Sequence, residues 1–291
     1  MATTVSSLRV DFEPKHASLK SADISLSGAA PLNLLKLFGL RPTSVPVPPL
    51  PEGVRVVTAA EYKQAAACLA EAFAEDEVVR YPVDTPDRVH WTKQEKWDLH
   101  VEMLEYVTYA HILKGLVTTV GDFEAVALWH VTPYPTPFLS LATHTVAYTR
   151  RMPPGSNMDD HLTMFKSGMW RLNYRLSAEG KRRFYNEFLP LLHDTKLGTL
   201  GGRDADSWYL VYIGTSLRGR GKGNASKLIR HVTSQADRDG VPVYLESSNE
   251  KNPPIYRRFG FETVRTVYLH RAEKNVELDI MVREAARVEK K

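Results

Sequence analysis

Cysteine is nearly absent from this 291-residue chain, which contains a single one, Cys68. An internal disulfide is therefore excluded, and a reducing compartment is the natural environment for the protein. Cys68 follows three alanines in a run typical of a buried helix face, and no base stands beside it in the sequence. We therefore expect an inert thiol and no cysteine chemistry.

Long apolar runs are missing too. No stretch reaches the roughly 18 residues that a bilayer-crossing helix needs, and the first residues lack the apolar centre of a signal peptide. A hydrophobic share of 43% and a charged share of 25% are ordinary for a globular protein with a real core. We expect a cytoplasmic protein without a membrane partner.

Several classes of functional site lack their signature in this sequence. The formal net charge is only +4, and Lys and Arg are interleaved with acids, so a nucleic-acid partner is not expected. The histidines show no metal-ligand spacing and no cysteine cluster exists, so we expect no metal. The absence of a Gly-x-Ser-x-Gly elbow disfavours a covalent hydrolase.

What is present begins with a proline-rich stretch, residues 43–53, which disfavours regular helix and central strand. It predicts that residues 1–53 form an arm with an extended linker, and that residues 54–291 form one domain. The early part of that domain has strand and helix periodicity and a hairpin signal at Gly121-Asp122. We expect strands at 54–57, 113–120 and 124–130, and helices at 59–73 and 93–109.

Residues 134–200 have a helical tendency and read as an insertion, with its last helix at about 180–193. This segment is rich in ring-bearing side chains, which would either line a substrate pocket or form a second hydrophobic core. They are Phe138, His144, Tyr148, Trp170 and Tyr174.

The pattern then changes to a strand, a glycine-rich loop, a helix and a second strand. The strand at 208–213 is continuously apolar, as in strands buried on both faces, and the helix at 225–239 precedes a strand at 241–246. Glycines in the loop at 217–224 let the backbone approach a ligand, and the following helix offers free N–H groups, which suits a pyrophosphate. The alternative is a surface turn whose basic residues only keep it soluble.

The loop lacks the Gly-x-x-x-x-Gly-Lys-[Ser/Thr] pattern of nucleoside triphosphatases. It also lacks Gly-x-Gly-x-x-Gly, although Glu246 on the next strand makes the exclusion of a dinucleotide fold less firm. The sequence Arg218-Gly219-Arg220-Gly221-Lys222-Gly223 fits (Gln/Arg)-x-x-Gly-x-(Gly/Ala). Downstream, Asn249 to Phe261 contains an Asn followed by Tyr-x-x-x-Gly-Phe.

In both motifs the chain resembles the GNAT superfamily of N-acetyltransferases, most clearly over residues 207–268 and more weakly over 54–133. Helix, loop and strand order in the weaker region is similar to the branch that acetylates puromycin and other small molecules. The resemblance implies a mixed α/β (α+β) fold with a central, mostly antiparallel sheet, flanked by helices and splayed where the strands at 207–215 and 241–247 part. It also implies acetyl-CoA as acyl donor and a small-molecule primary amine as acceptor.

The resemblance further assigns roles to particular residues. A strand edge would pair with the pantetheine arm, the loop backbone would hold the pyrophosphate, and Asn252 would bond pantetheine or order its loop. The cofactor-binding set is then Val211, Tyr212, Ile213, Thr215, Arg218, Gly219, Arg220, Gly221, Lys222, Gly223, Asn224 and Asn252. A backbone N–H in Val211 to Ile213 would polarise the thioester carbonyl.

Two side chains are the candidates for proton transfer. Tyr256 in the second motif would protonate the leaving thiolate as general acid, unless it is only a core aromatic. The amine must lose a proton before it attacks, and Glu246 is the first candidate for the base, with a structural pairing to Arg or Tyr as the alternative. The acidic run at 75–77 would either attract a cationic amine or simply be solvated.

Three other functions share parts of this pattern. A protein or peptide N-acetyltransferase would use the same cofactor motifs with an open acidic groove. A silent CoA-binding module would tolerate loss of Tyr256. A nucleic-acid binder built on Arg218, Arg220 and Lys222 would show strong salt dependence.

Overall fold

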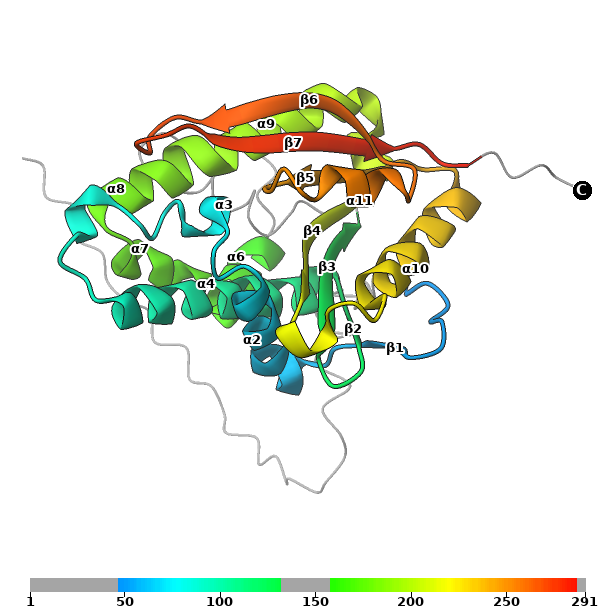
Figure 1. Ribbon diagram of the computed structural model, residues 1–291, viewed down its shortest axis with the longest axis horizontal. Helices are drawn as coiled ribbons and strands as arrows, with labels where there is room; N and C mark the ends of the chain where they lie inside the picture. Colours follow the sequence, from blue (N-terminus) through cyan, green and yellow to red (C-terminus); the bar gives the residue numbers. More distant parts are fainter. Residues whose placement is uncertain (1–46, 132–157, 287–291) are drawn as a thin grey trace, which may run out of the picture. The chain divides into compact units, whose positions relative to one another are not determined.

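Seven strands form one sheet in the order β1-β2-β3-β4-β5-β7-β6 (Figure 1). The computed structural model describes residues 47–131 and 158–286. Neighbouring strands are antiparallel except β4 and β5, which are parallel. The strands are β1 (Val54–Val56), β2 (Leu116–Val120), β3 (Ala125–Val131), β4 (Trp208–Thr215), β5 (Val243–Ser247), β6 (Glu262–Leu269) and β7 (Val276–Arg283). The prediction of a mixed fold with a mostly antiparallel sheet is confirmed.

The helices connect the strands and cover both faces of the sheet. The α-helices are α2 (Tyr62–Ala72), α3 (Glu77–Arg80), α4 (Lys93–Lys114), α6 (Met158–Ser167), α7 (Leu172–Arg175), α8 (Ala178–Lys181), α9 (Leu189–Leu200), α10 (Asn224–Asp239) and α11 (Pro253–Arg257). Short 3-10 segments are η1 (Ala59–Glu61), η2 (Pro86–Arg88), η3 (Met169–Arg171), η5 (Gly201–Asp206) and η6 (Leu217–Gly219). A π-helical segment, η4 (Arg182–Phe188), joins α8 to α9.

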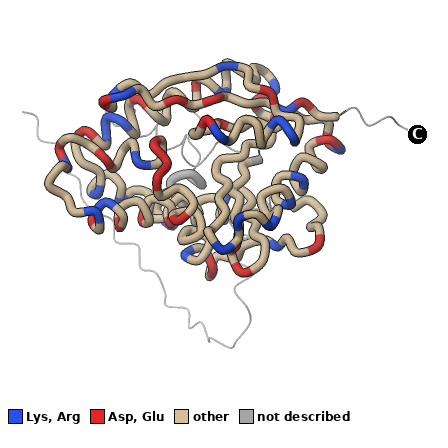
Figure 2. Tube along the Cα trace, in the orientation of Figure 1, with Lys and Arg blue, Asp and Glu red and all other residues tan. Residues whose placement is uncertain are grey.

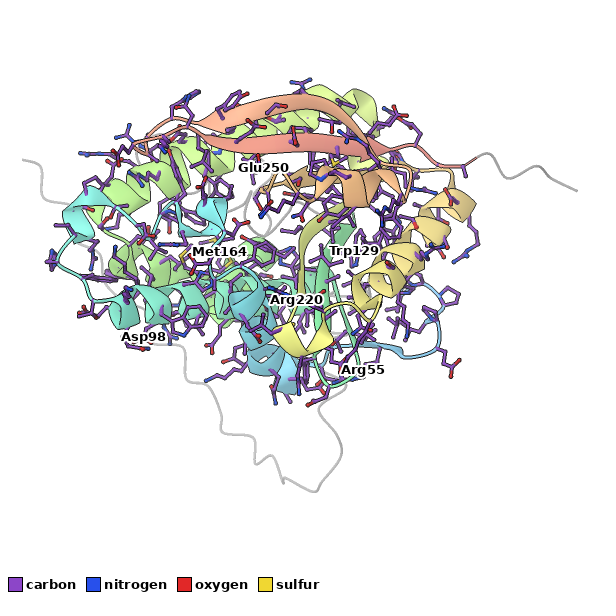
Figure 3. The ribbon with its side chains drawn as sticks, viewed as in Figure 1. Arg55, Asp98, Trp129, Met164, Arg220 and Glu250 are labelled. Carbon is purple, nitrogen blue, oxygen red and sulfur yellow. The ribbon has the colours of Figure 1, made fainter. Side chains whose placement is uncertain are left out.

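Successive side chains of strand β3 point to opposite faces of the sheet and so belong to different hydrophobic clusters. Trp129 packs with Leu228 and Ile229 of α10 in one cluster. Its neighbour Leu128 packs with Leu69 of α2 and with residues of α4 in another. Figure 1 shows α10 and α2 on different sides of the central strands, and Figure 3 labels Trp129 at the sheet.

A third apolar cluster lies where α9 meets the C-terminal strands. Leu200, at the end of α9, packs with Tyr209 of β4, Tyr244 of β5 and Ile280 of β7. Earlier in α9, Leu192 packs against a cluster that contains Leu278 of β7. Helix α9 therefore covers the part of the sheet where β4 gives way to β5.

The sheet opens between β4 and β5. Their ladder joins only Trp208 to Val243, Tyr209 to Tyr244 and Leu210 to Leu245. Beyond Leu210, β4 continues to Thr215 while it is paired only with β3. The predicted splay of these two strands is therefore present, and among the described residues no strand pairs with that edge of β4 beyond Leu210.

Several boundaries differ from the sequence-based expectation. The second helix runs to Lys114, so residues 113 and 114 are helical and the following strand begins at Leu116. Gly115 follows as the C-cap residue, and only glycine fits there, because a Cβ would lie 2.4 Å from the carbonyl oxygen of Trp129. The helix expected from Ala59 opens as a 3-10 turn, and α2 ends at Ala72.

Strands β6 and β7 were not predicted, although Thr263 to Leu269 is rich in β-branched and aromatic residues. They pair with each other and β7 pairs with β5. Figure 2 shows Lys and Arg interleaved with Asp and Glu over the described elements. Within 47–131 and 158–286, no helix is both long and apolar enough to cross a bilayer.

Candidate functional site

A pocket of about 150 Å³ lies where β4 and β5 separate. Its walls come from β4, β5, α9, the segment around α3, and the start of α11. The polar residues that line it are Asp76, His193, Lys196, Asp204, Tyr209, Tyr212, Glu246, Ser247, Ser248, Asn252 and Tyr256. Of the predicted site residues, Val211, Tyr212, Ile213, Glu246, Asn252 and Tyr256 are thus brought to one cavity, whereas Thr215 and the loop from Arg218 to Asn224 do not line it.

The exposed edge of β4 has an irregularity at its centre. Leu128 of β3 pairs with Tyr212, whereas the next residue, Trp129, pairs with Leu210. Val211 is therefore an extra residue opposite no partner in β3, as in a β-bulge. Because a bulge releases backbone groups from the ladder, the edge at Val211 can offer an N–H to a ligand in the pocket.

The glycine-rich loop leads directly into α10. Gly221 and Gly223 have φ values of +76° and +73°, the left-handed region that favours glycine. Gly219 packs so closely that an added Cβ would be 2.3 Å from the carbonyl oxygen of Glu124. The backbone conformation therefore explains why residues 221 and 223 are glycine, and the close approach to Glu124 explains Gly219.

The loop's backbone N–H groups are only partly free. Gly219 donates to the Ser216 carbonyl and Arg220 donates to the Leu217 carbonyl, so their N–H groups are used within the loop. Within the described chain, the N–H groups of Gly221, Lys222 and Gly223 have no backbone acceptor outside regular elements. With the first turn of the 16-residue α10, they form the part of the loop that can hold an anion.

The basic side chains of the loop face the β2–β3 hairpin. Arg218 pairs with Asp122 at 3.2 Å, and Lys222 pairs with Glu124 at 2.7 Å. Asn224 also donates to Glu124, at 2.9 Å, and these contacts lower the pKa of that carboxyl, Lys222 most of all. Arg220, labelled in Figure 3, makes no ion pair with any described residue.

Tyr256 lies on α11, which Asn252 begins as the N-cap residue. The Asn252 carbonyl accepts from the Tyr256 N–H at 3.1 Å, and the Tyr256 ring packs edge-on against Phe261 at 5.9 Å. Burial, and next the charge of Asp76, raises the pKa of the phenol. Tyr256 therefore reaches the pocket fully protonated at neutral pH.

Glu246 projects into the pocket from the end of β5. Burial raises its pKa to about 7, while Tyr209, Tyr244 and Lys196 favour the ionised form. Within the described chain, Glu246 Oε1 is buried and accepts no hydrogen bond of normal geometry. A carboxyl with this pKa and an unpaired oxygen is suited to accept a proton near neutral pH.

The acidic run at 75–77 divides into three different environments. Asp76 lines the pocket, and burial raises its pKa against the hydrogen bonds it accepts from Ser248, Val79 and Val78. Glu75 pairs with Arg80 at 2.9 Å, and Glu77 is exposed. The alternative in which the acidic run is simply solvated is therefore wrong for Asp76.

The ring-bearing side chains of the insertion were expected either to line a substrate pocket or to form a second hydrophobic core. The two that the structure describes, Trp170 and Tyr174, do neither. Trp170 and Tyr174 are 38% and 79% exposed and line neither the pocket nor a core. They contact each other on the surface with ring centroids 6.1 Å apart, because the short η3–α7 turn presents them away from the sheet. Phe138, His144 and Tyr148 lie outside the described residues.

Sequence reasoning missed the contribution of α9. Phe188, immediately before it, and His193 and Lys196 within it line the pocket. The helix was expected to end at about His193, whereas it continues to Leu200 and carries Lys196 over the sheet. A lysine in a helix gives no sequence signal of burial, so only the tertiary structure reveals it.

Known proteins that are similar to this chain are acetyltransferases. The acetyltransferase (GNAT) domain family matches residues 193–264. An uncharacterized N-acetyltransferase of Schizosaccharomyces pombe is 44% identical over 228 residues, which cover 78% of this chain and 81% of the relative. Similar solved structures include a Corynebacterium glutamicum protein described as a histone acetyltransferase and related acetyltransferase (19% identity, 81% and 97% of the two chains, TM-score 0.42). Arylalkylamine N-acetyltransferase 2 of Aedes aegypti is another (14% identity, 80% and 98%, TM-score 0.41).

Proposed function

Because the chain belongs to the GNAT superfamily of N-acetyltransferases, we propose that it transfers an acetyl group from acetyl-CoA to the primary amine of a small molecule. The transfer is direct, within a ternary complex, and needs no covalent enzyme intermediate. One observation carries the proposal: the separation of β4 from β5 brings Glu246 and Tyr256 into the wall of one pocket.

The donor binds along the free edge of β4. The amides of the pantetheine arm pair with the backbone from Val211 to Thr215, with which no described strand pairs on the β5 side. The pyrophosphate is held by the N–H groups from Gly221 to Asn224, with Arg218, Arg220 and Lys222 supplying positive charge nearby. Asn252 bonds the pantetheine arm or orders its own loop, as its place in the pocket wall supports.

The chemical step is the attack of a neutral amine on the thioester carbonyl. Glu246 accepts the amine proton, directly or through water, since its pKa of about 7 leaves much of it ionised at neutral pH. An N–H at the Val211 bulge stabilises the carbonyl oxygen as it gains negative charge. Tyr256 gives its proton to the departing thiolate of CoA.

The size and lining of the pocket favour a small acceptor. The cavity is about 150 Å³, and its walls combine apolar side chains, such as Phe73 and Phe188, with the carboxyls of Asp76, Asp204 and Glu246. Asp76 and Glu246 attract a cationic amine, and the apolar wall accepts a compact hydrocarbon body.

The test measures release of free CoA thiol from acetyl-CoA with a panel of small amines and of peptides. We expect turnover with a small amine, and a loss of at least about 100-fold in kcat for Tyr256→Phe. Tyr268→Phe is the matched control, because Tyr268 is 41% exposed and lies outside the pocket. Acetyl-CoA affinity, measured by calorimetry, should be similar in all three proteins.

Other outcomes identify the alternatives. Turnover with peptides but with no small amine would make the protein a peptide N-acetyltransferase. Tight acetyl-CoA binding without turnover of any acceptor would favour a silent CoA-binding module. Absence of CoA binding would refute the proposal altogether.

A further inference from the structure

Lys196 of α9 is a buried cation inside the pocket, and the proposed roles above do not use it. Its side chain is 9% exposed and forms an ion pair with Asp204 of η5. Its Nζ also donates to the Ser207 hydroxyl at 3.3 Å. Since burying an ammonium is costly without such partners, its place is specified by the fold.

The rings of two tyrosines lie beside the same ammonium. Lys196 Nζ is 5.7 Å from the centre of the Tyr209 ring and 5.9 Å from that of Tyr244, within the range of cation–π attraction. The two rings meet edge to face, 5.4 Å apart, and their residues are paired across β4 and β5 just before the strands separate. The ammonium therefore lies beside the Tyr209–Tyr244 pair, next to the position where β4 and β5 separate and the pocket begins.

Glu246 is the group on which this arrangement acts. It lies two residues after Tyr244 in β5, so both side chains project from the same face of the sheet. The Lys196 charge and the phenols of Tyr209 and Tyr244 all favour the ionised carboxylate, against the effect of burial. Other ionisable groups of the pocket are Asp76, His193, Asp204, Tyr212 and Tyr256, and Arg265 of β6 acts on Tyr244.

We propose that Lys196 is a positioning residue for catalysis: its ammonium, held by Asp204 and Ser207 against the Tyr209–Tyr244 pair, places a positive charge in the pocket that Glu246 lines, where Glu246 accepts the amine proton. The inference rests on the proposed role of Glu246 as base. It assigns no contact between Lys196 and the reacting atoms. Its consequence is a shift in the pH dependence of the reaction.

The experiment compares the pH profile of kcat/KM in wild type, Lys196→Met and Lys196→Arg. Without the ammonium, the midpoint of the acid limb should move to higher pH by about 1 unit, the size expected for loss of a nearby opposite charge. Lys196→Arg should restore the wild-type midpoint. Lys274→Met, at an exposed position in the turn between β6 and β7, is the control and should leave the profile unchanged.

A second variant guards against unfolding of Lys196→Met, in which the ion pair between Lys196 and Asp204 is lost. The double change Lys196→Met with Asp204→Asn removes both charges and should still move the limb upward, with a normal circular dichroism spectrum. An acid limb at the wild-type midpoint in both variants would overturn the proposal for Lys196.

Glu246→Gln separates this failure from failure of the proposed function. If Glu246 is the base, this variant loses the acid limb and most of its activity, whatever Lys196 does. If Glu246→Gln keeps both the acid limb and the activity, Glu246 is not the base. The inference about Lys196, which depends on that role, is then wrong as well.

Discussion

Ser248 Oγ donates a hydrogen bond of 2.5 Å to Asp76 Oδ2, and this bond joins the end of β5 to the segment between α2 and α3. The other oxygen of the same carboxylate accepts from the N–H groups of Val78 and Val79, both at 3.0 Å, and so caps α3. Since Asp76 and Ser248 both line the pocket, the bond fixes two of its walls relative to each other.

Replacing Asp76 and Ser248 together should cost less unfolding free energy than the sum of the two single replacements. We expect Asp76→Ala to cost about 1–2 kcal/mol of unfolding free energy, because it removes a helix cap, and Ser248→Ala to cost about 1 kcal/mol. The double variant should cost less than that sum, because the two residues share one bond. Urea denaturation of the four proteins gives the cycle, and strict additivity would contradict the shared contact.

Glu246→Gln should stabilise the protein at alkaline pH while it abolishes activity. The pKa of Glu246 rises from 4.5 to about 7 on folding, so its contribution to stability is fully present below pH 4.5 and is lost as the pH rises through 7. The variant should therefore gain about 1–3 kcal/mol over wild type at pH 8, and the gain should shrink toward pH 5.

Denaturation at pH 5 and pH 8 measures this difference. In the wild type, kcat/KM should rise through about pH 7, because the base acts in its ionised form. A gain in stability that is equal at both pH values would contradict the assignment of the titration to Glu246.

Gly219→Ala should damage the loop by steric contact. The new Cβ would lie 2.3 Å from the backbone oxygen of Glu124, which cannot move without distorting β3. We expect a lower melting temperature and at least about tenfold weaker acetyl-CoA binding, since a 1.4 kcal/mol loss corresponds to that factor.

Gly198→Ala is the control for that experiment. Gly198 is an exposed residue within α9, and an added Cβ there meets no atom within 4 Å. Because Ala has the higher helix propensity, this change should leave acetyl-CoA binding intact and stabilise the protein by up to about 1 kcal/mol. Equal effects of the two substitutions would refute the steric argument.

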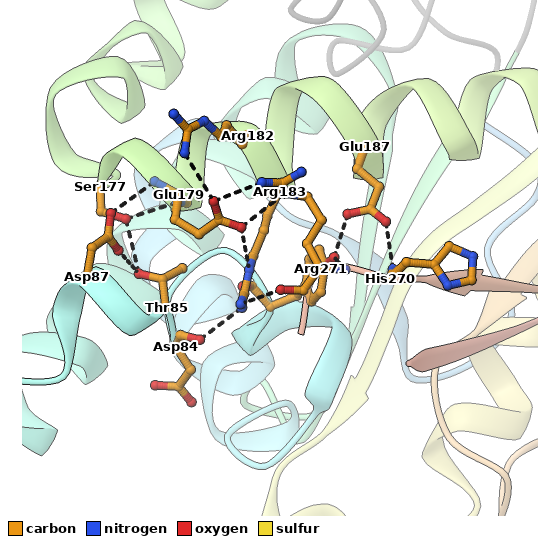
Figure 4. A network of polar contacts seen from close by, with 12 residues as sticks. Asp84, Thr85, Asp87, Ser177, Glu179, Arg182, Arg183, Glu187, His270 and Arg271 are labelled. Atoms are coloured by element: carbon orange, nitrogen blue, oxygen red, sulfur yellow. Dashed lines mark hydrogen bonds and ion pairs between the residues drawn. The ribbon is translucent and has the colours of Figure 1, made fainter. Parts of the chain in front are cut away.

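Arg183→Met should destabilise the protein strongly. The side chain is 4% exposed and donates to the carbonyl oxygens of Tyr81, Asp84 and Arg271 at 2.7–3.0 Å (Figure 4). It thereby joins η4 to the segment after α3 and to the turn between β6 and β7. Loss of a buried charge with these partners should cost about 3 kcal/mol.

The neighbouring Arg182→Met is the matched control. Arg182 is 61% exposed, and Glu179, at 3.6 Å, is its one ion-pair partner in the part of the chain that the structure describes. Its loss should change the melting temperature little, because exposed ion pairs contribute little to stability. Comparable losses for both variants would show that the carbonyl contacts of Arg183 are not the cause.

The local part of the fold was accessible from sequence because the signals were local. The apolar run at 208–213, the glycines at 219, 221 and 223 and the helix after them correctly predicted β4, its loop and α10. Periodicity likewise found α4, but it could not find the helix end at Lys114. The need for glycine just after that end comes from the close approach of Gly115 to Trp129, a contact between distant residues.

The sequence by itself determined the strand–loop–helix unit and the motifs that include Tyr256 and Asn252, because each depends on residue types at short spacing. Only the tertiary structure decided which of the acids enters the pocket: Asp76 does, whereas Glu75 pairs at the surface. It alone also placed Lys196 beneath Tyr209 and Tyr244. The physical reason is that burial and charge pairing arise between segments far apart in the chain, where side-chain pattern carries no information on distance.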